Sequence, residues 1–170
     1  MPTGLKQTSS TISIGFKVSE LAANTFAQGS VDLNLSPLDR EVFVVTAINL
    51  DPLPPDAIPA TDTGVNASLT TTSQTTTVNL DDSNCLATAS LAIRAGGFVD
   101  AGVGFTRNGM ETPPATLDYI GIIATNDFFV QLVGEGNINT KRVFGKVYGY
   151  RARADADIYA ALVQSEVLSA

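Results

Sequence analysis

Apolar and polar residues alternate in short runs along much of the chain, a pattern typical of half-buried β-strands. Ile12, Ile14, Phe16 and Val18 give residues 11–18 one apolar face. In residues 41–50 both alternating sets are apolar, which predicts a central strand covered on both sides. Further strands are expected at residues 31–35, 98–105, 119–124, 128–133 and 141–153, with 119–124 and 128–133 forming a hairpin around residues 125–127.

The alternation also predicts which side chains share a face. In the central strand, the even-numbered residues are expected on one face and the odd-numbered residues on the other: Val42, Val44, Thr46, Ile48 and Leu50 against Phe43, Val45 and Ala47. In the last strand, Gly145 and Gly149 share a face with Val143 and Val147. These two glycines should leave room there for a large side chain or a close neighbour.

Other segments depart from simple alternation. Four prolines within residues 51–59 predict an extended loop rather than an interior strand, and residues 112–114 form another loop. The Thr-rich residues 65–80 are expected to form two short strands or one bent strand. Residues 85–94 are ambiguous: alanines, a capping candidate at Asn84 and a glycine pair after them favour a short helix, whereas alternation favours a strand. We take the helix as the prediction.

These elements add up to an all-β fold. We expect an antiparallel β-sandwich or jelly roll of about eight strands, with a short C-terminal helix. The helix should begin near Asp155 or Asp157, and its packing stripe should be Ile158, Ala161, Leu162, Ser165 and Leu168. A single domain is expected over residues 1–170, with an N-terminal arm at 1–10 and the helix within 154–170.

The net charge of −7 conceals a strongly basic segment. Residues 141–153 carry +5 with no acid among them, which leaves −12 on the rest of the chain. The segment is predicted to bind acidic surface on neighbouring subunits through Lys141, Arg142, Lys146, Tyr148, Tyr150, Arg151 and Arg153. Two other interpretations are a solvated strand with paired charges and a stacking surface for single-stranded nucleic acid. Because an acidic chain repels phosphate, direct nucleic-acid binding is not expected.

The composition excludes several kinds of site. The chain has no His, no Trp and one Cys, Cys85, which is expected to be a small buried residue. Without His, the common catalytic triads and zinc sites lack their usual base and ligand. We therefore expect no catalytic residues, no metal, no cofactor and no enzymatic activity; a carboxylate-based hydrolase is the remaining catalytic alternative. No apolar run approaches the roughly 18 residues of a membrane span.

The order of these features resembles that of viral coat proteins built on a single jelly roll. The resemblance rests on the neutral N-terminal arm before Ile12, since the first 40 residues have zero net charge, and on the central strand at 41–50. It rests also on the proline loop, the Thr-rich segment and the closing basic strand before the helix. It implies a structural, self-assembling shell subunit located in a virion, with copies of itself and other shell proteins as partners. The alternative is a β-sandwich binding module at the cell surface or outside the cell, which recognises a glycan or a host receptor.

Overall fold

The computed structural model describes residues 2–100, 102–108 and 117–170, so the loop expected at residues 112–114 lies outside the described residues. Within them the chain forms ten strands and one helix. Their bounds are β1 Leu5–Gln7, β2 Ile12–Ser19, β3 Ala27–Asp32, β4 Glu41–Pro52, β5 Thr63–Thr70, β6 Cys85–Arg94, β7 Val103–Asn108, β8 Gly121–Ile123, β9 Asp127–Glu135, β10 Arg142–Ala154 and α1 Ala156–Leu168.

The strands form two antiparallel sheets with jelly-roll topology. Sheet A runs β1-β10-β4-β8, with β2 beside β1 on the same edge of β10, and sheet B runs β3-β9-β5-β6-β7. Four pairings are nested along the chain: β2 with β10, β3 with β9, β4 with β8 and β5 with β6. The chain is thus a long antiparallel hairpin whose successive pairs alternate between the two sheets. This confirms the predicted jelly roll, to which β1 and β7 add outer strands.

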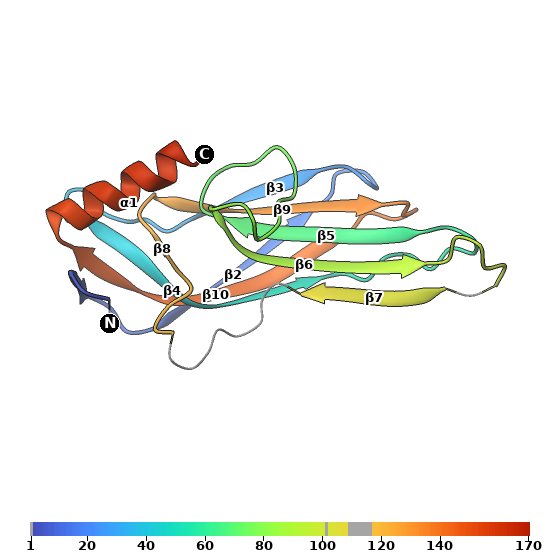
Figure 1. Ribbon diagram of the computed structural model, residues 1–170, viewed down its shortest axis with the longest axis horizontal. Helices are drawn as coiled ribbons and strands as arrows, with labels where there is room; N and C mark the ends of the chain where they lie inside the picture. The colour runs from blue at the N-terminus through green and yellow to red at the C-terminus, as the bar shows by residue number, and fades with distance from the viewer. Residues whose placement is uncertain (1, 101, 109–116) are drawn as a thin grey trace.

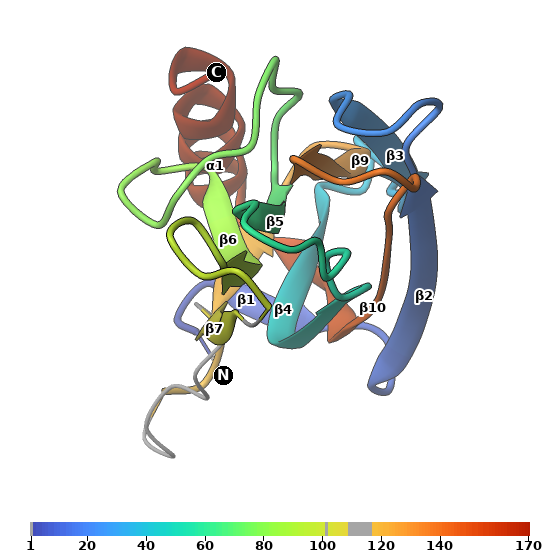
Figure 2. The same ribbon diagram turned by 90° about the vertical axis from the view of Figure 1, so that its right-hand side faces the viewer.

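The inner faces of the two sheets share one apolar core. It includes Phe43 from sheet A and Leu69, Phe128 and Leu132 from sheet B, all almost fully buried. The ring of Phe16 meets that of Phe128 edge-on at 5.8 Å, between the two sheets. Figures 1 and 2 show the strands running along the long axis of the molecule, with α1 at one end. The space between the sheets is therefore filled by apolar side chains.

A bulge in β4 corrects the predicted facing of its side chains. Between β4 and β10 the register shifts at Tyr148 and Gly149, so Thr46 is the extra residue, and its hydroxyl donates to the carbonyl of Tyr148 at 3.1 Å. Val42 and Val44 therefore lie on the outer face beneath α1, whereas Ile48 and Leu50 join Phe43 and Val45 in the core between the sheets. The predicted single face for 42, 44, 46, 48 and 50 was wrong.

The C-terminal helix covers one end of the outer face of sheet A. Ile158, Tyr159, Leu162 and Val163 pack over a second apolar cluster that includes Val42, Val44, Tyr150 and Ala152. Glu166 is also buried, and its two carboxylate oxygens accept the backbone N–H groups of Ala124 and Thr125 at 2.8 and 3.0 Å. The helix begins where predicted, but only Ile158 and Leu162 of the predicted stripe pack on the sheet. Ala161, Ser165 and Leu168 are exposed, so that part of the prediction was wrong.

Residues 85–94 form strand β6, not the predicted helix. β6 pairs with β5 on one side and β7 on the other, so neighbouring strands satisfy its backbone groups. Its inward residues Ala87 and Ala89 are small enough for the narrow space between the sheets. Alanine here reflects tight packing rather than helix propensity.

Two other predictions near the sheet ends were wrong. Residues 119–124 and 128–133 do not form a hairpin, because β8 pairs with β4 in sheet A and β9 pairs with β3 and β5 in sheet B. The strand expected at 31–35 lies earlier, at Ala27–Asp32. It ends because Asn34 adopts a positive φ of 51°, and Leu33 donates its N–H to the carbonyl of Asn126 outside the ladder.

Candidate interaction surfaces

Lys141, the first of the predicted contact residues, is buried and paired within the subunit. Its ammonium lies 2.6 Å from Oδ1 of Asp56, and the two side chains are 7% and 19% exposed. Oδ2 of Asp56 accepts the backbone N–H groups of Ile138 and Asn139. Donation from Lys141, helped by these backbone groups, lowers the pKa of Asp56 to about 2. The pair ties the proline loop to the segment before β10.

Arg151 and Arg153 are also engaged within the subunit. The guanidinium of Arg151 donates to the carbonyls of Leu33 and Asn34 and to Glu41, at 2.7, 3.0 and 3.1 Å. Arg153 pairs with Asp39 at 3.2 Å, both side chains being more than half exposed. These contacts hold the end of β10 to the segment between β3 and β4. The interpretation of the basic strand as paired surface charge holds for this half of β10.

The remaining predicted residues divide between the two ends of β10. Tyr150 is buried beneath α1, and burial raises the pKa of its phenol. Arg142 and Lys146 are exposed, and Tyr148 is half-buried. They share the outer face of sheet A with Phe144, which is 36% exposed, and with Lys17, its cross-strand partner on β2. We call Lys17, Arg142, Phe144, Lys146 and Tyr148 the Phe144 face; its role in subunit contact stays a prediction.

A second exposed surface, which the sequence analysis missed, lies along β7. In the described part of the chain β7 pairs only with β6, and its residues 103–107 are exposed. Val103 and Phe105 are 49% and 56% exposed, and Phe98 and Val99 in the preceding turn are 52% and 81% exposed. We call these four residues and the unpaired side of β7 the β7 edge. Alternation predicted a strand at residues 98–105, but the strand begins only at Val103 and runs to Asn108, so the predicted bounds were wrong. Alternation also could not show that both faces would be exposed.

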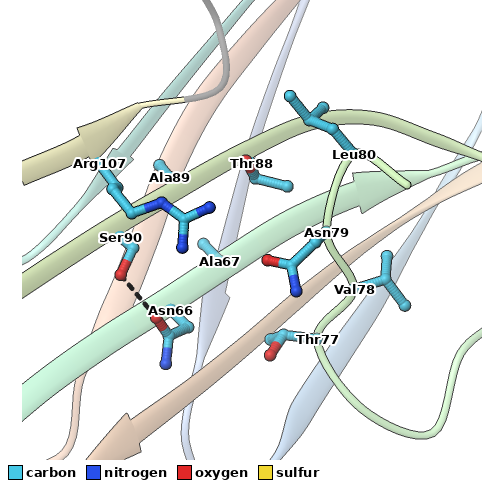
Figure 3. A pocket seen from close by; sticks show the side chains of 10 residues that line it. All are labelled: Asn66, Ala67, Thr77, Val78, Asn79, Leu80, Thr88, Ala89, Ser90 and Arg107. Atoms are coloured by element: carbon cyan, nitrogen blue, oxygen red, sulfur yellow. Dashed lines mark hydrogen bonds between the residues drawn. The ribbon is translucent and has the colours of Figure 1, made fainter. Parts of the chain in front are cut away.

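The outer face of sheet B carries a polar groove. Two adjoining pockets, of about 460 and 550 Å³, share Asn66, Ser90 and Arg107. These three residues form one cross-strand row over β5, β6 and β7. The loop at residues 77–80 borders the first pocket, and Phe105 and Glu135 line the second. Figure 3 shows the guanidinium of Arg107 lying over the sheet, between the row and the loop.

A buried polar network holds the loop that follows β5 against sheet B. The Gln131 side chain accepts a hydrogen bond from Ser68 at 2.8 Å and donates to Thr70 at 2.8 Å and to Gln28 at 3.0 Å. From the loop, the backbone N–H of Gln74 donates to Gln28 and that of Val78 donates to the Ser68 hydroxyl. The predicted Thr-rich segment is therefore one strand, β5, followed by a loop packed on the sheet. This packing fixes one wall of the groove.

Cys85 and the acidic residues show no nucleophilic or metal-binding arrangement in the described residues. Cys85 is half-buried, and burial raises the pKa of its thiol to about 11, so the thiol stays protonated at neutral pH. No group of three or more Cys, Asp or Glu side chains gathers there at metal-binding distance. The single helix of the described chain is too short and too polar to cross a membrane.

Comparison with known proteins gives structural likenesses only. No protein-family model matches the sequence, and no curated protein matches it. A solved structure of Desmodium yellow mottle tymovirus is 11% identical, with 92% of this chain and 95% of that chain covered and a TM-score of 0.32. The empty head of turnip yellow mosaic virus is 12% identical, with 91% of this chain and 86% of that chain covered and a TM-score of 0.31. Turnip yellow mosaic virus is 12% identical, with 88% of this chain and 99% of that chain covered and a TM-score of 0.30. The chain resembles these virus structures weakly, at the level of architecture, and the jelly-roll assignment rests on the strand pairing above.

Proposed function

We propose that this protein is a self-assembling shell subunit, a non-enzymatic coat protein of a virion that acts as a single domain. The observation that carries the proposal is the β7 edge on a jelly-roll body. Jelly rolls form capsid, lectin and cupin domains. Apolar side chains fill the space between the sheets, which supports a rigid subunit whose contacts with other molecules are made on its outer surface.

The β7 edge is the first proposed contact between copies. β-Proteins that remain monomeric cover or charge their edge strands, because an open edge offers unpaired backbone groups to another chain. Here the edge carries one charge, Arg107, beside exposed apolar residues. Antiparallel pairing of two β7 strands about Phe105 places each Arg107 opposite Val103 of the partner subunit. That arrangement brings apolar side chains together and keeps like charges apart.

The Phe144 face is the second proposed contact, and it retains the exposed members of the predicted basic set. Lys17, Arg142 and Lys146 lie beside an exposed aromatic ring on a chain of net charge −7. One acid, Asp51, lies opposite the ring on β4, so the positive charges outnumber it three to one. Acidic surface is available on a neighbouring copy at Asp155 and Asp157, which are exposed at the start of α1. The contact between the Phe144 face and the start of α1 joins two different surfaces, so it can repeat from one copy to the next and form a row. The twofold β7 contact can then join one row to another.

The experiment is to measure particle size for the full chain. Light scattering after size exclusion and negative-stain microscopy are expected to show large regular particles. Phe105→Lys places a charge at the centre of the β7 edge and should leave small species. Leu21→Lys, at a residue that is 99% exposed and lies away from β7, is the matched control and should assemble normally. A wild-type chain that stays monomeric at all concentrations and salt conditions overturns the proposal.

A surface binding module is the second candidate function, and the polar groove on sheet B favours it. The two functions predict different states of the pure protein. A binding module is a monomer or small oligomer that needs no copies of itself for ligand binding, whereas a shell subunit assembles without any ligand. The particle-size measurement therefore separates them.

A further inference from the structure

We infer that the groove on the outer face of sheet B binds a saccharide that carries a carboxylate, with Arg107 as the anchor for that carboxylate. The groove lies on the face of the sheet, whereas the proposed β7 contact runs along its edge. Phe105 and Arg107 border both surfaces, so sugar binding and particle size are measured separately. The inference adds a ligand to the surface of the subunit.

The central row of the groove presents hydrogen-bond donors in a fixed orientation. The hydroxyl of Ser90 donates to Oδ1 of Asn66 at 2.6 Å, as the dashed line in Figure 3 shows. Because this bond occupies the Asn66 oxygen, the amide nitrogen faces away from Ser90 with two N–H groups to donate. Asn79 brings a second amide from the loop across the pocket. The row thus suits a ligand rich in oxygen acceptors.

Arg107 gives the groove a positive charge that forms no ion pair with the described residues. In residues 2–100, 102–108 and 117–170 no carboxylate lies within ion-pair distance of its guanidinium, whereas Arg94 in the second pocket pairs with Asp62 at 3.6 Å. A guanidinium binds a carboxylate through two parallel hydrogen bonds, which gives both affinity and orientation. A single carboxylate on the ligand is therefore matched by Arg107.

The floor and walls of the groove fit a sugar ring. The small residues Gly64 and Ala92 leave space above the sheet for a ligand, and Phe105 offers an exposed ring at one end. Hydroxyl groups of Thr77 and Thr88 line the first pocket. Each pocket lies in the 300–1,000 Å³ range typical of small-ligand sites. Alternating polar groups and an apolar ring face match the hydroxyls and the C–H face of a saccharide.

The charge balance disfavours a polyanion such as a nucleic acid. Glu135 lines the second pocket, and the whole chain carries −7. A phosphate chain would have to lie along both pockets and would meet this carboxylate. A saccharide instead places its carboxylate at Arg107 and offers a hydroxyl for Glu135 to accept. One charged group on a hydroxylated ligand is thus the best match.

The test uses the full-length protein with three probes: sialyllactose, trigalacturonic acid and lactose. Titration calorimetry, which is suitable for monomers and particles, should show binding of sialyllactose, trigalacturonic acid or both, and the responding sugar identifies the source of the carboxylate. Lactose should bind about tenfold more weakly, as expected for the loss of one charge-assisted contact. Equal binding of lactose and the acidic sugars, or no binding of any of them, overturns the inference.

Variants then locate the site. Arg107→Ala should weaken binding of the acidic sugar about tenfold or more. Asn79→Asp, which places a negative charge in the loop wall, should weaken it as well. Lys6→Ala, at an exposed cation on β1 of sheet A, is the matched control and should leave affinity unchanged. Unchanged affinity in Arg107→Ala, with a thermal unfolding curve like that of the wild type, overturns the inference. Particle size of each variant is measured in parallel, so a failure of assembly is scored separately.

Discussion

The ammonium of Lys141 lies 2.6 Å from a carboxylate oxygen of Asp56, although 85 residues separate the two in the chain. The pair is mostly shielded from water, and Asp56 also accepts the N–H groups of Ile138 and Asn139. Lys141 therefore stabilises the interior of the subunit, and the accessible positive charge of the segment is carried by Arg142 and Lys146.

Asp56→Ala is expected to destabilise the protein by about 3 kcal/mol, the cost of leaving a buried charge without its partner. The variant also leaves the N–H groups of Ile138 and Asn139 without their acceptor. The free energy of unfolding in urea measures the loss. Arg153→Ala breaks the exposed pair with Asp39 and should cost less than about 1 kcal/mol. Equal losses in the two variants would contradict this ranking.

The same pair predicts a loss of stability in acid. The pKa of Asp56 is about 2 in the folded chain against an ordinary 3.8, chiefly because Lys141 donates to the carboxylate. Since the folded state holds fewer protons than the unfolded state between these values, the pair stabilises the protein above 3.8 and is lost as the pH falls toward 2. The difference in unfolding free energy between wild type and Asp56→Asn should shrink across that window. A constant difference would refute the assignment.

Glu166 predicts the opposite dependence on pH. Burial raises the pKa of this carboxyl above its ordinary 4.5, although the N–H groups of Ala124 and Thr125 oppose the shift. The folded state therefore holds more protons just above pH 4.5, and wild-type stability should fall as the pH rises through this range. Glu166→Gln removes the titration, so the variant should lack this decline. Val167→Thr, at an exposed and uncharged neighbour, should keep the wild-type slope.

Gly149 is required by a close approach of β4 and an aromatic ring. A Cβ at this position would meet the carbonyl oxygen of Val44 and would lie 2.7 Å from the Phe43 ring. Gly149→Ala should therefore destabilise the fold by about 1–3 kcal/mol, as measured by thermal or urea unfolding. Gly104→Ala, where a Cβ meets nothing within 4 Å, is the matched control and should change stability little. Equal effects at both positions would exclude the steric explanation.

Local patterns in the sequence predicted much of the fold, because alternation reports which face of a strand is buried. The central position of β4 and the start of α1 are confirmed. So is the prediction for the glycines of β10, since the ring of Phe16 lies against Gly145 and that of Phe43 against Gly149. In each case the spacing within one short segment was enough to predict the feature, although it could not identify the distant side chain or strand that lies against it.

The predictions that were wrong concern features that depend on contacts between segments far apart in the sequence. Strand β6 is fixed by β5 and β7, which override the helix propensity of its alanines. The extra residue Thr46 reverses the facing of half of β4, and alternation counted along one strand cannot include a bulge. Similarly, the partners of Lys141 and Arg151 lie 85 to 118 residues away. No spacing within residues 141–153 distinguishes a buried lysine from a free one.

The place of β10 between β2 and β4 has a consequence for the newly made chain. β10 follows the other nine described strands in the chain, yet it pairs with the early strands β1, β2 and β4. Until the ribosome releases residues 142–154, the early strands of sheet A lack the strand that joins them. Native pairing of sheet A must then await the synthesis of β10, and a fold that depends on such long-range closure forms slowly. Chaperone protection of the nascent polypeptide would matter most in that interval.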